Sequence, residues 1–500
     1  MALVSRLADH SLATLPPEVA RPGYERAALA PGIVHLGIGA FMRAHLAVAT
    51  EAALHAERDL RWGIVGVSLR QPDARDALAP QGGLYTVAVR DADGSGRPRQ
   101  RLQVIGCVQR VLVAPEDPNA VLEAIADPAT AIVSLTVTEK GYAREAATGA
   151  LQFGQPEIAH DLLHPDAPRS AVGFLVHGLA RRHARGLSPI TLLSLDNLPH
   201  NGQTLRRLVL AFAERVQPAL ASWIATGCTF PCSMVDRIVP RTTDGDRAAV
   251  AEALGCDDAW PVLAEPFFDW AVEDHFAAGR PAWDAGGARF VTAAAPWEHL
   301  KLRMVNGTHS AIAYLGSVAG WRTVDVALAQ PTLGHFVEQL MAREIEPTLP
   351  ALPGLVLADY RRALLARFAN PALAHRTQQI AMDGSQKLPQ RLLGSVRDRL
   401  AVRQPIGHLA LAVAAWLHYL RGHDEAGEPY AIDDPQAAAL TALWHDAAGL
   451  PGALARAQAL TRYAPVFGDL ANAPALAAAV APALESLRQH GVRATLEALA

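Results

Sequence analysis

The stretch KLRMVNGTH, from Lys301 to His309, contains side chains that can exchange a proton with a hydroxyl group or hold its oxygen. A lysine can lose its proton when it is desolvated or lies near another cation, whereas an arginine stays protonated. On an α-helix, at about 100° per residue, Asn306 lies about 140° from Lys301 and His309 about 80° from it, so all three can line one wall of a cleft. Gly307 costs such a helix about 1 kcal/mol relative to alanine, which suggests that a ligand or another backbone approaches it closely. The spacing alone is more typical of a surface helix with scattered polar residues.

Lysine is rare in this chain, which makes each lysine informative. Only Lys140, Lys301 and Lys387 are lysines, and the rest of the 45 basic residues are arginines. Because arginine supplies the ordinary surface charge here, a lysine is a candidate for a position where the side chain must be able to lose its proton. The alternative is that three lysines have simply survived drift.

A second group of polar residues follows a predicted buried strand over 190–196. The sequence continues as Asn197-Leu-Pro-His-Asn-Gly202. In open α/β sheets ligands bind beyond the carboxyl ends of the strands, so the Asn197 amide could point at a substrate. An Asx turn or a helix cap would explain the same Asp–Asn and Asn–Gly pairs.

A glycine turn, Gly37-Ile-Gly39, lies between a predicted strand over 32–36 and a predicted helix over 40–55. Gly37 permits the tight turn, and Gly39 lets the backbone approach a pyrophosphate at the start of the helix. Met42 stands where the dinucleotide-binding motif has its third glycine, so the motif alone is weak evidence.

The next predicted strand, over 62–68, bears on the choice of dinucleotide. An acidic residue that binds the ribose of NAD is expected at its end, but the sequence reads Ser68-Leu-Arg70. Because Arg70 could meet a 2′-phosphate, NADP is not excluded.

These residues need a scaffold, and the sequence predicts an α/β fold with two domains. In the first half, helical patterns lie between buried strands, including runs over 131–138 and 190–196, which indicates a doubly wound Rossmann-type domain. An antiparallel hairpin is expected over 84–90 and 102–108. From about Trp297 the chain is mainly helical, with helices predicted over 331–345, 360–368, 406–421, 437–448 and 451–460. We place the domains at 1–290 and 291–500.

Composition excludes several classes of protein. Half of the 500 residues are hydrophobic and 19% are charged, so large cores can form and wholesale disorder is excluded. A net charge of −4 gives no general attraction to nucleic acid or to an anionic membrane. Four cysteines cannot build a disulfide framework, and their spacing is poor evidence for zinc. The first residues lack the apolar core of a signal peptide, so we expect a cytoplasmic protein.

Six stretches, in order, resemble successive signatures of one enzyme family: IVHLGIGAFMRAH, SLTVTEKGY, SLDNLPHNG, FPCSMVDRIVP, KLRMVNGTHSAIAYLG and HRTQQIAMDGSQKLPQR. They are similar to those of the polyol-specific long-chain dehydrogenases, the mannitol dehydrogenase family. The resemblance runs from about Ile33 to Arg391 and covers the tail from about Arg397 only loosely. The stretches TEKGY and HRTQQIAMDGSQKLPQR look closest to the fructuronate reductase (D-mannonate oxidoreductase) branch.

The resemblance implies a Rossmann-type domain, a helical C-terminal domain, a cleft between them, and NAD-dependent chemistry without a metal. The glycine turn and the start of the following helix, with Gly37, Ile38, Gly39, Ala40, Phe41 and Arg43, are where we expect the cofactor, although a solvated first-turn face would also explain Arg43. The resemblance places the catalytic lysine at Lys301, the asparagines that hold the oxyanion at Asn197 and Asn306, and a histidine that orients the substrate at His309. It puts Asp236 and Lys387 on the substrate side. These positions include two of the three lysines. Chance survival of the lysines during drift is therefore a poor explanation for where they occur.

The implied chemistry suits these residue types. When a secondary alcohol is oxidised, its hydroxyl proton must leave as hydride departs, and the transition state has alkoxide character. One amide donor to such an oxyanion is worth about 3–4 kcal/mol. Lys301 would take the proton, which requires its pKa to fall from about 10.4 through burial or a neighbouring cation.

The substrate is the least determined feature. A sugar acid needs a cation for its carboxylate, and Arg376 and Lys387 are candidates, although a salt bridge elsewhere would explain Arg376 equally well. We expect interconversion of D-mannonate and D-fructuronate. A dehydrogenase for neutral polyols such as mannitol or arabinitol is the alternative, and a non-catalytic sugar- or nucleotide-binding regulator is disfavoured. The sequence leaves the oligomeric state open.

Overall fold

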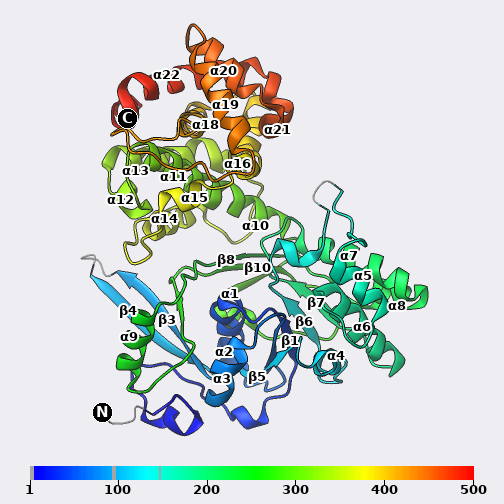
Figure 1. The fold of residues 1–500 in the computed structure, drawn as a ribbon. Coiled ribbons are helices and arrows are strands. Elements are labelled where there is room, and N and C mark those ends of the chain that lie inside the picture. The colour runs from blue at the N-terminus through cyan, green and yellow to red at the C-terminus, as the bar shows by residue number, and fades with distance from the viewer. Residues whose placement is uncertain (1–4, 93–96, 146–147, 500) are drawn as a thin grey trace. The chain divides into compact units, whose positions relative to one another are not determined.

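The computed structural model describes residues 5–92, 97–145 and 148–499. Two compact units make up the chain (Figure 1): residues up to Asp91 and from Pro98 to Ala295 form the first, and the chain from Pro296 forms the second. In the described residues, no single helix is long and apolar enough to cross a membrane; one pair, 464–472 with 474–497, passes that test jointly but is bent by 114°.

The central feature of the first unit is a five-stranded parallel sheet in the order β5-β2-β1-β6-β7. Its strands are β1 Ile33–Leu36, β2 Ile64–Ser68, β5 Val108–Val113, β6 Ile132–Leu135 and β7 Thr191–Ser194. In chain order this is the 3-2-1-4-5 arrangement of a doubly wound sheet, which confirms the Rossmann-type prediction. The strand order reverses between β1 and β6, where such sheets bind their ligands.

Helices of the first unit alternate with these strands. They are α1 Ala40–Ala44, α2 Leu46–Glu57, α3 Asp73–Leu78, α4 Pro118–Ile125, α5 Pro156–Leu163, α6 Ala171–Ala184, α7 Asn201–Val216, α8 Pro218–Gly227 and α9 Asp244–Leu254. The helix predicted over 40–55 is interrupted at His45, whose φ of −122° and ψ of −82° are not helical. The His45 ring is stacked between Phe41 and Phe268, at centroid distances of 4.9 and 4.4 Å, and this tertiary packing accompanies the break.

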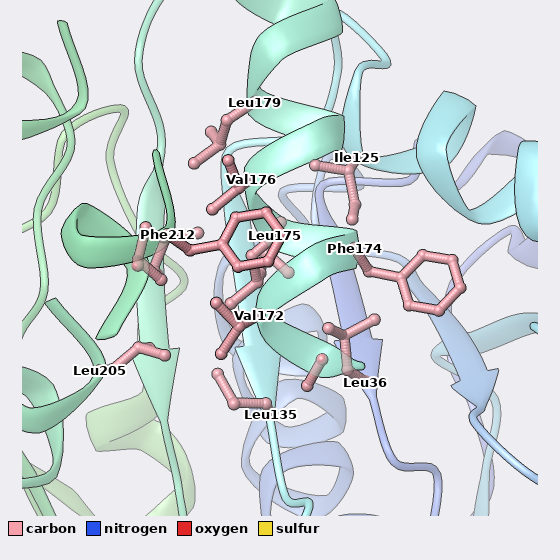
Figure 2. Close-up of a cluster of buried hydrophobic side chains, with 14 of the residues drawn as sticks. Leu36, Ile125, Leu135, Val172, Phe174, Leu175, Val176, Leu179, Leu205 and Phe212 are labelled. Atoms are coloured by element: carbon pink, nitrogen blue, oxygen red, sulfur yellow. The ribbon is translucent and has the colours of Figure 1, made fainter. Parts of the chain in front are cut away.

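Each face of the parallel sheet is covered by its own apolar core, because successive side chains of a strand point to opposite faces. Val34 and Leu36 of β1 belong to the cluster under α4, α6, α7 and α8, whereas Ile33 belongs to the cluster that includes Trp270 and Trp283. Figure 2 shows the first cluster, with Phe174 and its neighbours on α6 above the strands. Burying one such side chain is worth about 1.5–3 kcal/mol, so both faces fix the strand register.

Two smaller sheets complete the first unit. One has the order β4-β3-β9 and the other β11-β10-β8. Their strands are β3 Tyr85–Ala92, β4 Pro98–Ile105, β8 Ser233–Asp236, β9 Val262–Ala264, β10 Asp269–Glu273 and β11 Ala288–Val291.

The two strands predicted for the hairpin are present as the neighbours β3 and β4 of one sheet, and residues 93–96 of the expected turn lie outside the described residues. The prediction that the second strand extends to Val108 is wrong. The strand ends at Ile105, and Val108 begins β5 of the parallel sheet, which the sequence analysis missed. The carboxylate of Glu51 accepts hydrogen bonds from the backbone N–H groups of Gly106 and Cys107, at 2.9 and 3.0 Å. These two residues therefore bond to a helix side chain at the point where the chain passes from one sheet to the other.

The second unit is helical, as predicted. Its α-helices are α10 Ala295–Leu300, α11 Thr308–Val318, α12 Val324–Leu328, α13 Pro331–Gln339, α14 Leu357–Phe368, α15 Thr377–Ala381, α16 Gly384–Leu388, α17 Gly394–Ala401, α18 Gly407–Tyr419, α19 Ala437–Ala448, α20 Ala453–Thr461, α21 Ala464–Phe467 and α22 Pro474–Glu497. Three π-helical segments interrupt them: η6 Lys301–Gly307, η7 Leu340–Ile345 and η9 Pro389–Leu393.

Two of the π-helical segments lie inside longer helical runs and pack against each other. One run is α10-η6-α11 and the other is α16-η9-α17. A β-carbon at Gly307 would lie 2.5 Å from the carbonyl oxygen of Arg391, so the two backbones touch there and only glycine fits. The close approach predicted at Gly307 is therefore real, and its partner is another backbone. Such π-segments are rare and are often found at functional sites.

Candidate active site

The first unit contains a cavity of about 1060 Å³ at the point where the strand order reverses, lined by the turn Gly37–Gly39 and the ends of neighbouring strands. Gly37 has a φ of +96°, and a β-carbon there would lie 2.2 Å from the carbonyl oxygen of Thr136, so glycine is required. At Gly39 the nearest atom to such a carbon is 3.8 Å away, which leaves room beside its backbone. The turn thus has the shape that the sequence predicted.

The charge of this cavity suits an anionic ligand. The cations Arg70, Lys140 and Arg169 contribute to its lining, against one carboxylate, Glu157. Ser68 and Arg70 line the cavity beyond β2, with no carboxylate from that segment. The residues present therefore fit a dinucleotide with its phosphates, and they contain no acid of the usual kind for the ribose of NAD.

The remaining residues assigned to the cofactor follow the turn. Ala40 and Phe41 begin α1 and, like Arg43, are not among the residues that line the cavity. Arg43 is buried: its guanidinium donates to the carbonyl of Trp260 at 2.6 Å and lies 5.4 Å from the ring centre of Tyr85. Burial lowers the pKa of Arg43 to about 10. The structure thus places Arg43 in the interior, where it ties α1 to a loop far along the chain.

Asn197 follows β7, and the preceding residue fixes the loop around it. The carboxylate of Asp196 accepts hydrogen bonds from the N–H groups of Val137 and Thr138, at 3.0 and 2.9 Å, and from the Tyr142 hydroxyl at 2.7 Å. These bonds join the ends of β6 and β7. Burial raises the pKa of Asp196 despite these donors. Asn197 itself is exposed.

Asn197 does not cap the helix that follows it. The residue before α7 is His200, and its side chain makes no capping bond. Asn201, the first residue of α7, instead donates to the carbonyl groups of Ser194 and Ser233, at 3.1 and 2.8 Å. It thereby ties the end of β7 to β8, whose last residue is the half-buried Asp236.

The second unit brings Lys301, Asn306 and His309 onto one helical run. Lys301 is 7% exposed and begins η6. The expected 140° between Lys301 and Asn306 assumed an α-helix and is wrong, because η6 has i→i+5 hydrogen bonding. A wider turn places residues five apart closer to one face, so Lys301 and Asn306 lie nearer to each other around the axis than the sequence predicted.

His309 lies in the first turn of α11 among aromatic and cationic groups. Its ring stacks on Phe368 at 4.8 Å and meets the edge of His375 at 5.1 Å. Burial, and then the positive charges of His375, Arg367 and Arg391, hold the pKa of His309 well below its usual range. His309 is therefore a neutral hydrogen-bonding group at neutral pH.

The two cations considered for a substrate carboxylate have different surroundings. Lys387 on α16 is half-buried, its ammonium donates to the carbonyl of Met382 at 2.6 Å, and Asp383 is 3.7 Å away. Burial, and then the charge of Arg391, lower the pKa of Lys387. Arg376 is exposed, and its backbone forms a bridge with Thr323.

Sequence reasoning missed Arg391, which the structure places beside the predicted residues. Its guanidinium donates to the hydroxyl of Ser310 at 3.1 Å, next to His309, and its backbone contacts Gly307. The signal was present, since Lys387 and Arg391 are four residues apart and share a helical face. Within the described ranges, no three His, Cys, Asp or Glu side chains are arranged to hold a metal ion.

Known proteins are similar to this chain over both compact units. Residues 31–285 match the mannitol dehydrogenase Rossmann domain, and residues 294–488 match the mannitol dehydrogenase C-terminal domain. The chain is 43% identical over 486 residues to the uncharacterized oxidoreductase YeiQ of Escherichia coli, with 97% of each chain covered. It is 42% identical to the D-mannonate oxidoreductase of the same organism, over 96% of this chain and 98% of the relative.

A solved structure covers almost the whole chain. It is the Pseudomonas fluorescens mannitol 2-dehydrogenase in a ternary complex with NAD and D-mannitol, with a TM-score of 0.81, 37% identity and 99% of both chains covered. These matches extend over both compact units and agree with the parallel sheet and the helical second half. The chain belongs to the mannitol dehydrogenase family.

Proposed function

We propose that this protein is an NAD-dependent oxidoreductase that interconverts D-mannonate and D-fructuronate, with Lys301 as the general acid and base. The observation that carries the proposal is the segment from Lys301 to His309, which combines a buried lysine, an amide and a neutral histidine in a chain of this family. The 42% identity to a D-mannonate oxidoreductase supports the choice of a sugar acid.

The cavity beside Gly37–Gly39 would hold the dinucleotide, which when bound accepts or supplies the hydride. Its cationic lining suits the phosphates. NAD is the proposed cofactor, as in the mannitol 2-dehydrogenase complex, and NADP is the alternative because of Arg70.

In oxidation, Lys301 would remove the proton from the substrate hydroxyl, and in reduction it would return it. Lys301 is 7% exposed, and its role as a base requires surroundings that favour the neutral amine. Asn197 and Asn306 would donate their amide N–H groups to the oxygen as it gains negative charge. His309, held neutral by its surroundings, would orient the substrate through a hydrogen bond, and Asp236 and Lys387 would contact its other groups.

Replacing Lys301 tests the catalytic assignment. We expect Lys301→Ala to lower kcat by between about 10²- and 10⁴-fold, the usual contribution of a positioned acid–base group. NADH binding, followed by fluorescence, should stay unchanged, and added methylamine should restore part of the rate by replacing the missing amine. Full turnover in Lys301→Ala would refute the role of Lys301. A regulator would be indicated if the wild type bound its ligands but turned over no substrate, and if Lys301→Ala left its ligand-dependent function unchanged.

The competing function is a 2-dehydrogenase for neutral polyols, and the D-mannitol in the related ternary complex favours it. Oxidation of NADH should therefore be measured with D-fructuronate and D-fructose in parallel, and repeated with NADPH. A preference for fructuronate of about tenfold or more in kcat/KM, roughly 1.4 kcal/mol, supports the sugar acid. A preference for fructose supports the neutral polyol.

A further inference from the structure

Arg391 is a partly buried cation of the second unit, and among the described residues its guanidinium forms no ion pair with a carboxylate. Its side chain is half-buried, and burial lowers its pKa. Its one hydrogen bond among the described residues goes to the neutral hydroxyl of Ser310, and no carboxylate of those residues lies within 4.0 Å of its guanidinium. Removing a charge from water without pairing it is costly, so a position of this kind suits an anionic ligand.

Lys387 adds a second positive charge to the same place. It lies four residues before Arg391 on one continuous helical run, and two like charges at this spacing repel each other. Asp383, four residues before Lys387, offsets one of the two. The other nearby carboxylate, Asp434, is already bonded to the N–H and hydroxyl groups of Ser385, at 2.7 and 2.6 Å. Asp383 and Asp434 thus supply negative charge to this neighbourhood, but among the described residues neither carboxylate is bonded to the guanidinium of Arg391, which keeps its N–H groups available for a ligand.

The same neighbourhood contains unused hydrogen-bonding capacity. In the described part of the chain, the buried hydroxyl of Tyr314 and the buried Nδ1 of His375 have no hydrogen-bond partner. Tyr314 interacts electrostatically with Arg391, and His375 is in ring contact with His309. Buried polar atoms are normally satisfied, so their lack of partners here is consistent with a polar ligand bound beside them.

We propose that Arg391, assisted by Lys387, binds the carboxylate of the sugar acid and is the residue that distinguishes a sugar acid from a neutral polyol. A guanidinium can grip a carboxylate with two parallel hydrogen bonds, which an alcohol group cannot reproduce. Contact of Arg391 with Ser310 and Gly307 holds this cation next to the helical segment of Lys301, Asn306 and His309. This inference rests on the proposed function, because it assigns the acid group of that substrate.

D-Mannonate and D-mannitol differ at one end, where the first has a carboxylate and the second an alcohol. Titration calorimetry of the NADH-saturated protein with each compound measures the carboxylate contact without turnover. We expect the wild type to bind mannonate at least tenfold more tightly than mannitol. Arg391→Gln should weaken mannonate binding by about 10- to 100-fold and leave mannitol binding within about threefold. Arg391→Lys keeps the positive charge but cannot form two parallel hydrogen bonds with a carboxylate. It should therefore restore part of the preference for mannonate over mannitol that Arg391→Gln loses.

Arg397→Gln is the matched control, because Arg397 lies on the same helical run, is exposed and is already paired with Asp469. It should behave as the wild type. Circular dichroism must show that the Arg391 variants are folded. If Arg391→Gln weakens both ligands equally, or leaves the preference for mannonate intact, Arg391 does not bind the carboxylate. Failure of the proposed function would be seen separately, as absence of turnover with every substrate pair or absence of NADH binding by the wild type.

Discussion

Replacing Gly307 with alanine tests whether the contact between the two π-helical segments sets the geometry of the site. The new β-carbon would lie 2.5 Å from the carbonyl oxygen of Arg391, so the backbones must separate by about 0.9 Å to reach an ordinary contact of 3.4 Å. Overpacking of this kind costs about 1–3 kcal/mol, and the better helix propensity of alanine returns about 1 kcal/mol. The free energy of unfolding should therefore fall by no more than about 2 kcal/mol.

The effect on activity should be larger than the effect on stability. A displacement of about 1 Å between reacting groups can cost about 100-fold in rate. We therefore expect kcat/KM for Gly307→Ala to fall by about 10- to 100-fold at a temperature where the protein remains folded. Steady-state NADH oxidation measures kcat/KM, and urea unfolding followed by circular dichroism measures the free energy of unfolding.

Gly394→Ala is the matched control, because its β-carbon would lie 3.5 Å from the nearest atom, the guanidinium of Arg303. This variant should keep wild-type kinetics and gain up to about 1 kcal/mol in stability. Wild-type kinetics for Gly307→Ala, or an equal loss in both variants, would refute the reasoning.

Two further predictions concern the first unit. Gly37→Ala puts a side chain on a backbone with φ of +96° and against Thr136, so NADH affinity in a fluorescence titration should fall at least tenfold; unchanged affinity would show that the turn does not hold the cofactor. His35 is buried between the hydroxyl groups of Ser134 and Thr136, and burial lowers its pKa to about 3. Because the unfolded chain binds this proton near pH 6.5 and the folded protein does not, the stability contributed by neutral His35 is present above pH 6.5 and is lost as the pH falls toward 3. His35→Asn should therefore reduce the slope of unfolding free energy between pH 6.5 and 4, whereas equal slopes in both proteins would contradict this origin.

The parts of the fold that could be predicted are those with local signals. The Gly37 turn lies between apolar strands, and buried runs over 131–138 and 190–196 contain β6 and β7. By contrast, β5 follows β4 almost without a break, and the residues between the two strands bond to Glu51, which is distant in sequence. No local pattern in VQRVLV separates the two strands.

The candidate site shows the same division. Lys301, Asn306 and His309 were noted for their residue types and were assigned roles by the family resemblance, but η6 was not predicted, because KLRMVNG has no local feature that selects i→i+5 bonding. The tertiary contact of Gly307 with the Arg391 carbonyl accompanies this segment, and it joins residues 84 positions apart in the printed sequence. Arg43 was assigned to the cofactor because it follows the glycine turn, whereas its burial beside Trp260 required knowledge of a loop from another part of the chain.

The bonds made by Asp196 have a thermodynamic consequence. They connect the segment after β6, which lines the cavity proposed to hold the dinucleotide, to Asn197, the proposed donor to the substrate oxygen. A ligand that orders the segment after β6 lowers the entropy cost of binding a second ligand at Asn197. The coupling between the two binding events is reciprocal. Whatever factor the dinucleotide contributes to substrate affinity through Asp196, the substrate must contribute to dinucleotide affinity, so removal of this one carboxylate would abolish that part of the coupling without touching either ligand.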